Sequence, residues 1–445
     1  MKITKILTAS ILCLSLILSI TACTDGKGSS NTISLTSEQQ GVISNAASLL
    51  PEYELENKVV KQYGFYDING AADIVPAINL FEQKYGGSIE YVQVDWEQRF
   101  TALANLIMSG DSPDIFPRED NVWPDGISNN QYEALDDYID FESPLWSGTK
   151  EIADQYAWNG KHYYVPWVTA NGDILFYDKT RFEEFAIQDP MDLYEQGKWD
   201  WNAFKNILTE WTEIDDEHIG YRGANARPWI ASTGKALVGI GDDGLIVNNI
   251  RDNDIARVQE FLQTLRQEEL ISEEYQGPDA AMKEGLTAFY GTGEWALEGI
   301  QEKLPDHEIG IVVFPKDPNA DEHYIQDGSF GYMVIAGSKN VEGAVAFLSC
   351  CRLMQLDADL SQTTKDVMLK ERGYEEWQYE YLMDIRSGKH PLIVDNSYGL
   401  GPSVEESLGK LLDEPIFRGE PWATVREEHY NVIDEVIKSY NAELK

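Results

Sequence analysis

Apolar and polar residues follow two different periods in the amino-terminal part of the chain, and these periods predict strands and helices in turn. Residues 59–67 are rich in β-branched and aromatic side chains, which is typical of a strand, and residues 89–94 repeat this composition. Residues 74–85 carry apolar side chains at helical spacing, and a second helical pattern runs from 100 to 108 and ends at Gly110. Because strands that alternate with helices favour parallel pairing, an α/β region with a parallel sheet is predicted.

A stretch with two short apolar runs, residues 160–179, divides the chain. Residues 163–165 form the first run, which Pro166 closes because proline has no N–H to donate to a strand ladder. Residues 174–177 form the second run, after the polar segment 169–172. This pattern predicts two strands with a break, placed either where the chain passes between two domains or in a hairpin of one domain.

The second half of the chain continues the mixed pattern. Residues 256–270 have the spacing of an amphipathic helix, and residues 309–314 form an apolar run closed by a proline. The segment 239–244 matches GxGxxG, but its two aspartates would face a pyrophosphate, so a glycine-rich turn after a helix is predicted. Four apolar residues are expected in the core rather than on a binding surface: Trp199, Phe204, Leu208 and Trp211.

The amino terminus has the layout of a secretory signal. Lys2 and Lys5 precede an apolar run of about 15 residues, which is shorter than the roughly 20 residues of a membrane span. The run ends at a lipobox-like Ile-Thr-Ala-Cys, so we expect a signal peptide at 1–22 and a lipid on Cys23, with a spanning anchor as the alternative. Residues 23–56 start Ser-, Thr- and Gly-rich, without periodicity, and predict a flexible tether.

The charge and the cysteines exclude several classes of protein. A net charge of −41 repels nucleic acid and anionic lipid, so membrane attachment is expected to be covalent. We interpret the acidic surface as a solubility feature, with a cationic ligand as the weaker alternative. Cys350 and Cys351 are neighbours in a predicted helix, where adjacent side chains point apart, so buried thiols without a disulfide are expected.

Five segments, in order along the chain, resemble the extracellular solute-binding proteins of ABC importers, the maltose-binding-like family 1. They are LFEQKYGGSIEYVQVDW (80–96), SGDSPDIFPREDNVWPDGI (109–127), the stretch 160–179, EGLTAFYGTGEWALEGI (284–300) and DGSFGYMVIAGSKNVEGAVAFLSC (327–350). The resemblance implies a two-lobed α/β fold of the periplasmic-binding-protein type, in which each lobe is a sheet flanked by helices and a hinge and cleft separate the lobes. The implied lobes are 57–165 plus 315–352 and 166–314 plus 353–445, with crossings near 165–169, 311–315 and 351–356.

The resemblance also implies a carbohydrate site in the cleft, where aromatic rings stack on sugar rings and polar groups hold the hydroxyls. The expected ligand-binding residues are Tyr66, Asp67, Arg118, Glu119, Trp167, Asn171, Trp229, Glu294, Trp295 and Tyr398, with Trp96 and Trp123 at the rim. Glu294 departs from the lysine or small residue that is frequent in the family, which leaves the polarity of that wall open.

Signatures of catalysis and metal binding are missing from the sequence. It contains no HExxH, GxSxG, Walker or CxxC motif, and the acidic residues Asp317, Asp321, Glu322 and Asp327 lack EF-hand spacing and are expected to be solvated. Binding without catalysis, cofactor or metal is therefore expected.

Taken together, the sequence predicts a monomeric, lipid-anchored substrate-binding protein of an ABC importer at the outer face of the cytoplasmic membrane. Its expected partners are a sugar or oligosaccharide, the permease subunits and the membrane through Cys23, with no nucleic acid. A peptide- or polyamine-binding protein of the same fold, a surface carbohydrate-active enzyme, and a non-transporting adhesion or sensory lipoprotein are the alternatives.

Overall fold

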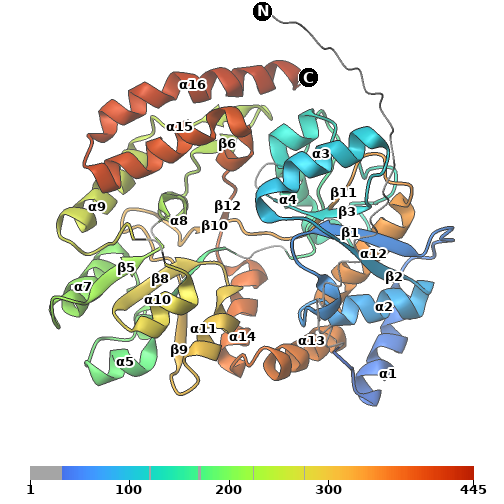
Figure 1. The fold of residues 1–445 in the computed structure, drawn as a ribbon, viewed down its shortest axis with the longest axis horizontal. Coiled ribbons are helices and arrows are strands. Elements are labelled where there is room, and N and C mark those ends of the chain that lie inside the picture. Colours follow the sequence, from blue (N-terminus) through green and yellow to red (C-terminus); the bar gives the residue numbers. More distant parts are fainter. Residues whose placement is uncertain (1–32, 120–121, 169–171, 224, 275, 445) are drawn as a thin grey trace, which may run out of the picture.

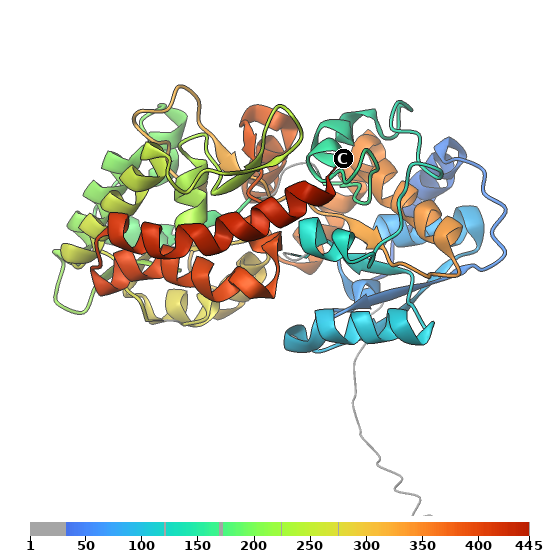
Figure 2. The ribbon, with the colours of Figure 1, turned by 90° about the horizontal axis from the view of Figure 1, so that it is seen from above.

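The computed structural model describes residues 33–119, 122–168, 172–223, 225–274 and 276–444. The predicted signal peptide, Cys23 and Asn171 lie outside the described residues. Within them the chain forms two four-stranded sheets with helices packed around them, and the two halves lie side by side in Figures 1 and 2.

The first sheet has the strand order β11-β3-β1-β2, and we call the half built around it the first lobe. β1 (Val59–Gly64) pairs in parallel with β2 (Ser88–Gln93) and β3 (Ile115–Pro117). β11 (Tyr332–Val334) comes from much later in the chain and pairs antiparallel with β3. The parallel pairing predicted for residues 59–67 and 89–94 is confirmed.

Two helices of the first lobe begin and end close to the predicted residues. α2 (Val75–Tyr85) and α3 (Arg99–Ser109) follow β1 and β2. Each stops at a glycine in the left-handed region, Gly86 with φ 66° and Gly110 with φ 75°, a conformation that is strained for residues with a side chain. α2 packs against α12 (Val341–Leu356), the buried helix that follows β11.

The second sheet has the order β5-β8-β4-β9, and we call the half built around it the second lobe. β5 (Ile219–Arg222) is parallel to β8 (Thr287–Thr292), whereas the fully buried β4 (Ile174–Asp178) runs antiparallel to both β8 and β9 (Ile309–Val313). The strand predicted at 163–165 is reduced to a single bridge, in which Tyr164 pairs with Met333 of the first lobe.

Four helices cover much of the second lobe. α7 (Trp201–Thr212) begins at Asp200, whose carboxylate accepts a hydrogen bond from the Ala203 N–H. α9 (Asn253–Gln267), α15 (Pro402–Asp413) and α16 (Trp422–Glu443) pack with it around one hydrophobic core. The predicted core residues Trp199, Phe204, Leu208 and Trp211 are at most 2% exposed, which confirms that expectation.

Most of the remaining α-helices and strands of the two lobes are short, and α13 is the longest of them. They are α4 (Lys150–Gln155), α5 (Lys179–Glu184), α6 (Pro190–Glu195), α8 (Ala226–Ala231), β6 (Val238–Ile240), β7 (Ile246–Asn248), α10 (Pro278–Glu284), α11 (Ala296–Lys303), β10 (Ile325–Gln326), α13 (Ala358–Glu371), α14 (Glu376–Asp384) and β12 (Leu392–Ile393). The segment 239–244 is a turn, as predicted, but it joins β6 and β7 in a hairpin rather than following a helix.

The helices after β11 lead the chain from the first lobe to the second. Residues 351–356 lie inside α12, and α13 still packs against α1 and α2 of the first lobe. α14 packs on the second sheet, where Gln378 donates to the Ile309 carbonyl and Tyr381 accepts from the Val313 N–H. Residues 351–356 therefore belong to a helix that packs in the first lobe, whereas α14 packs in the second.

A helix replaces part of the expected tether. α1 (Ser37–Ala46) starts with a capping box, in which Thr36 Oγ1 accepts from the Gln39 N–H and the Gln39 side chain accepts from the Thr36 N–H. Its Ile43 and Ala46 are buried in the core of the first lobe. The tether prediction is wrong for this segment, because capping and packing on α2 stabilise a helix whose own pattern is weak.

The two carboxy-terminal cysteines behave as predicted. Cys350 and Cys351 are free thiols, fully buried in α12. Burial raises the pKa of both thiols well above the ordinary range, so they remain protonated and inert as nucleophiles.

Candidate functional site

A cavity of about 520 Å³ opens in the second lobe beside the carboxyl ends of β5 and β8. Ligands of open α/β sheets bind outside the carboxyl ends of strands, so its position is the one expected of a binding site. Its walls come from the residues after β5, from residues 272–274, from β8 and from the end of α15. They are Gly223, Asn225, Ser272, Glu273, Glu274, Tyr290, Gly409, Lys410, Asp413, Glu414, Phe417 and Arg418.

The wall of this cavity carries more acidic than basic side chains. Arg418 Nη2 lies 2.7 Å from Glu273 Oε1, and Lys410 Nζ lies 2.6 Å from Glu406 of the preceding helical turn. Partial burial raises the pKa of the Asp413 carboxyl, and the nearby Arg227 guanidinium opposes that rise. Carboxylates, an amide and an aromatic ring next to one another are groups that hold hydroxyls and the apolar faces of small molecules.

The predicted first-lobe residues lie after two parallel strands. Tyr66 and Asp67 follow β1, and Asp67 accepts from the Asn69 N–H at 2.9 Å and so fixes the turn behind it. Arg118 and Glu119 follow β3. Since β1 and β3 are parallel neighbours, the structure brings these four residues to the same edge of the first sheet.

Internal contacts hold the polar groups of this edge. Arg118 donates from Nη1 to the Tyr156 hydroxyl (2.8 Å) and from Nε to the Ser329 carbonyl (3.2 Å). Glu119 Oε2 lies 3.5 Å from Arg99 Nε. Burial raises the pKa of Tyr66, so its hydroxyl stays protonated and can donate.

A second, smaller cavity of about 110 Å³ lies where the lobes meet, and Trp167 and Glu294 line it. The Trp167 indole is 4% exposed and stacks on Tyr332 with ring centroids 5.0 Å apart. Glu294 forms an ion pair with Arg386, which also lines the cavity. The sequence left the polarity of this wall open, and in the structure the wall contains the ion pair between Glu294 and Arg386. No local sequence pattern marked Arg386 for this role.

Three predicted aromatic residues expose their rings. Trp295, between β8 and α11, is 65% exposed, Tyr398 is 39% exposed, and the rim residue Trp96 is 49% exposed. Arg227 Cζ lies 3.5 Å from the Tyr398 ring centroid, and Arg99 Cζ lies 3.5 Å from the Trp96 ring centroid.

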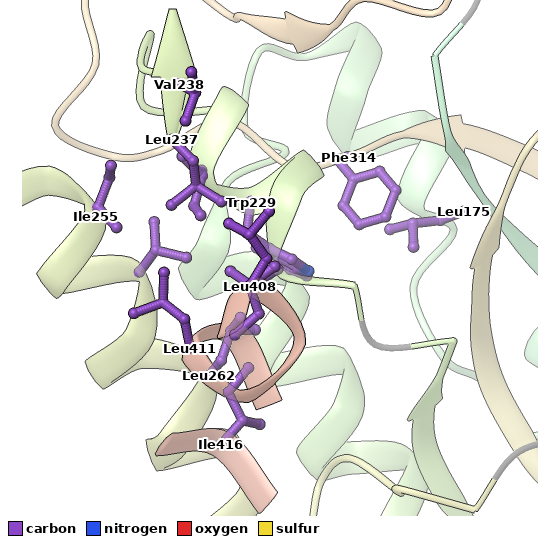
Figure 3. Packing of buried hydrophobic residues seen from close by; sticks show 14 of the residues in the cluster. Leu175, Trp229, Leu237, Val238, Ile255, Leu262, Phe314, Leu408, Leu411 and Ile416 are labelled. Carbon is purple, nitrogen blue, oxygen red and sulfur yellow. The ribbon is translucent and has the colours of Figure 1, made fainter. Parts of the chain in front are cut away.

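Two predicted site residues lie in the core instead. Trp229 has no exposed surface and packs against Trp201, Phe204 and Phe314. Figure 3 labels Trp229 among other buried residues of the same cluster. Trp123, the second rim candidate, is 3% exposed and donates from Nε1 to the Ala157 carbonyl. Neither ring offers a face to a ligand in this structure, so the expectation is corrected for both.

The acidic residues 317–327 are also not all solvated. Asp317 is buried and accepts two hydrogen bonds from Arg257, and Asp327 accepts from the Tyr156 hydroxyl at 2.9 Å. Asp321 and Glu322 are exposed, as expected. In the part of the chain that the structure describes, no three His, Cys, Asp or Glu side chains are grouped so as to hold a metal.

The fold and the cavity together define a two-lobed binding protein. Residues 77–367 match the sequence profile of the bacterial extracellular solute-binding proteins, and the chain belongs to that family. Members of this family are binding proteins rather than enzymes. No described helix combines the length and the apolar composition needed to cross a bilayer.

Among characterised proteins, the chain is similar to the multiple sugar-binding protein of Streptococcus mutans. The two are 20% identical over 276 residues, which is 57% of this chain and 63% of that relative's length.

Solved structures with the same fold include the galacto-N-biose-/lacto-N-biose I-binding protein of an ABC transporter from Bifidobacterium longum (TM-score 0.66, 13% identity, 88% of this chain and 99% of that chain). An ABC substrate-binding protein from Listeria monocytogenes in complex with cycloalternan has a TM-score of 0.64 at 15% identity, over 86% of this chain and 99% of that one. UgpB from Mycobacterium tuberculosis, in complex with glycerophosphocholine, has a TM-score of 0.64 at 14% identity, over 86% and 99% of the two chains. These similarities confirm the two-lobed α/β fold that the sequence predicted.

Proposed function

We propose that this chain is the lipid-anchored substrate-binding protein of an ABC importer, and that it binds a saccharide between its lobes without chemical change. The observation that carries the proposal is the cavity at the carboxyl ends of β5 and β8, with the exposed rings of Trp295 and Tyr398 in the same lobe. The sugar-binding relative from Streptococcus mutans and the saccharide complexes of the same fold support it.

Aromatic and polar groups would have different roles in such a site. The apolar face of a pyranose ring stacks on an indole or phenol ring, and the desolvated contact stabilises the complex. On the second-lobe side, Glu273 and Glu274 would accept hydrogen bonds from hydroxyl groups, and the Asn225 amide would accept or donate them. On the first-lobe side, the proposed partners are Tyr66, Asp67, Arg118 and Glu119, with Trp96 at the rim; Trp167, Glu294 and Arg386 would close the site at the lobe junction.

Ligand binding is proposed to stabilise the closed arrangement of the lobes. A ligand that contacts both lobes has its highest affinity for the closed form, so it shifts the equilibrium by that difference in affinity. The lobe boundaries proposed for this motion are those expected from the sequence, with the third crossing moved to lie between α13 and α14.

A peptide or polyamine is the second candidate ligand, because the cavity wall contains four carboxylates and two cationic side chains. Charge pairing with a cationic ligand weakens as salt screens it, over a Debye length of about 10 Å at 0.1 M ionic strength. Stacking and hydrogen bonding of a neutral saccharide depend much less on salt.

A thermal-shift screen of saccharides, polyamines and short peptides, repeated at low and high salt, tests the proposal. A ligand at about 100 times its Kd stabilises the fold by about 2.7 kcal/mol. We expect a saccharide hit whose effect persists at high salt, and recovery of that saccharide intact after prolonged incubation. Hits among cationic ligands only, with loss at high salt, would favour the second candidate; cleavage that survives repurification would identify an enzyme.

The lipid anchor is tested separately at Cys23. Lipid chains supply about 0.8 kcal/mol per buried CH₂, and the acidic protein surface does not attract anionic membranes. Cys23→Ala is expected to give soluble or unprocessed protein in cell fractionation. A processed variant that stays in the membrane fraction as the wild type does would refute the anchor.

A further inference from the structure

Tyr398 is presented outward by a turn that is otherwise buried. It belongs to the turn Ser397–Leu400, in which Ser397 and Leu400 have no exposed surface, whereas Tyr398 is 39% exposed. The turn is thus buried on both sides of Tyr398, which is its exposed residue.

A buried guanidinium covers one face of this ring. Arg227, in the first turn of α8, is 8% exposed, and its Cζ lies 3.5 Å from the Tyr398 ring centroid. At this distance above the centroid the guanidinium occupies one face of the ring, and Tyr398 still keeps 39% of its surface exposed. A cation on an aromatic face is worth most when it is desolvated, as here.

The guanidinium is fixed by the same turn that carries the ring. Arg227 Nε donates to Ser397 Oγ at 3.1 Å and lies 4.0 Å from Asp395 Oδ2. Asp395 Oδ1 in turn accepts from the Ser397 N–H at 2.9 Å. Arginine and ring therefore share one set of anchors, and the orientation of one determines that of the other.

This pair also adjoins the candidate cavity. The α8 N-cap Asn225, which lines the cavity, accepts from the Arg227 N–H at 3.1 Å. The charge of Arg227 acts on the pKa of Asp413 in the same wall. Arg227 therefore links the cavity wall to the ring.

The turn also lies against the first lobe. A Cβ on Gly401, directly after the turn, would come within 2.8 Å of the carboxylate of Asp125, in the first-lobe segment Val122–Gly126. The turn that carries Tyr398 therefore lies where the second lobe meets the first.

We propose that Arg227 is a positioning residue that holds the Tyr398 ring as a stacking platform for the apolar face of a saccharide. The inference rests on the proposed function. A ring whose orientation is already fixed loses little conformational freedom when a ligand stacks on it, so the support increases affinity without touching the ligand.

A double-mutant cycle on ligand affinity tests this role, with the saccharide identified in the thermal-shift screen and calorimetry as the measurement. Tyr398→Ala is expected to weaken binding about tenfold. Arg227→Met, which keeps the length of the side chain but removes the cation, should cause most of the same loss. The double variant should bind no more weakly than Tyr398→Ala, and Arg227→Lys, which restores a cation under the ring, should recover part of the affinity.

The chain offers a matched control for the stack itself. Arg251 Cζ lies 3.6 Å from the ring centroid of Tyr430 on α16, away from the cavity walls. Arg251→Met is expected to leave saccharide affinity unchanged. If Arg227→Met does not fold, Ser397→Ala takes its place, because it removes the Nε acceptor while the charge remains.

Several results would overturn the inference. Losses that add in the double variant would show that Arg227 and Tyr398 act separately, and an unchanged affinity in Arg227→Met or Tyr398→Ala would show no platform at this ring. If the wild-type protein binds saccharide and only these variants behave otherwise than expected, the inference fails and the proposed function stands. If the wild type binds no saccharide at all, both fail.

Discussion

The aromatic residues of the second lobe form two groups with opposite environments. Trp201, Phe204, Trp211 and Trp229 are at most 4% exposed and contribute to one core, part of which Figure 3 shows. Trp295 and Tyr398 are 65% and 39% exposed. In the first group the buried rings stabilise the folded state. In the second group the rings are exposed in this structure, and on the proposed function they would be buried further when a ligand binds.

The largest effect is expected from Trp229→Ala. Removing a fully buried indole leaves a cavity among Trp201, Phe204 and Phe314 and costs about 3–5 kcal/mol of the free energy of unfolding. Urea unfolding measures it, and the folded fraction should still bind ligand with wild-type affinity. A stable Trp229→Ala protein with weakened ligand binding would show that Trp229 belongs to the binding site and not to the core.

A buried imidazole extends the comparison to polar groups. Burial lowers the pKa of His323 to about 4, against about 6.5 for an unfolded chain. Between these values the unfolded state binds a proton that the folded state excludes, so the free energy of unfolding falls as the pH drops from about 6.5 to about 4, by at most about 3 kcal/mol.

Urea unfolding at pH 7 and pH 5 measures this loss, with His323→Gln as the comparison variant. Gln can still donate to the Phe314 carbonyl, which lies 2.7 Å from His323 Nε2, but it does not titrate. We expect a smaller drop in the variant, with a remainder from His390, whose pKa burial also lowers. Identical drops in both proteins would contradict the assignment.

Trp295→Ala should show the opposite behaviour to Trp229→Ala. Because the ring is mostly exposed, the free energy of unfolding should change by less than about 0.5 kcal/mol. Saccharide affinity should fall about tenfold through loss of a stacked ring. Met108→Ala, which removes a 77% exposed side chain from α3, is the control for exposure alone and should change neither quantity. A Trp295→Ala protein that unfolds easily but binds saccharide normally would contradict the division between structural and ligand-binding aromatic residues.

The smallest effect is expected where the two lobes touch through the end of α16. Figures 1 and 2 show this helix extending from the second lobe toward the first, and the Tyr440 hydroxyl lies 3.0 Å from Asp125 Oδ1. Tyr440→Phe is expected to cost about 0.5–1 kcal/mol and to increase the radius of gyration of the ligand-free protein in solution scattering. Tyr85→Phe removes a comparable hydrogen bond, to the Pro51 carbonyl within the first lobe, and should leave the radius of gyration unchanged.

Sequence patterns predicted the first lobe best, because its elements carry local signals. Residues 74–85 and 100–108 have helical spacing, and Gly86 and Gly110 end both helices. α1 was missed because its stability comes from the Thr36 capping box and from Ile43 packing against a distant part of the chain. The neighbours of α13 have no local sequence signal either, since only packing brings it against α1 and α2.

The candidate site was harder to predict than the fold. α8 is six residues long and all of its residues are buried, so it has no polar face whose spacing would mark Trp229 as a core residue. The order of residues along the chain alone suggested that Trp229 belongs to the site. Glu273, Lys410 and Asp413 line one cavity but come from segments far apart in sequence, each without a motif. Partners of this kind are set by tertiary packing alone.

The late return of β11 has a consequence for how the protein is made. β4, β5, β8 and β9 all lie between residues 174 and 313, so every strand of the second sheet is synthesised before β11. The first sheet starts with β1 at residue 59, yet β3 has no partner on one side until Tyr332–Val334 is available. The lobe that is begun first is thus the last to complete its sheet, and the open edge of β3 is where a nascent chain is most exposed to wrong pairing.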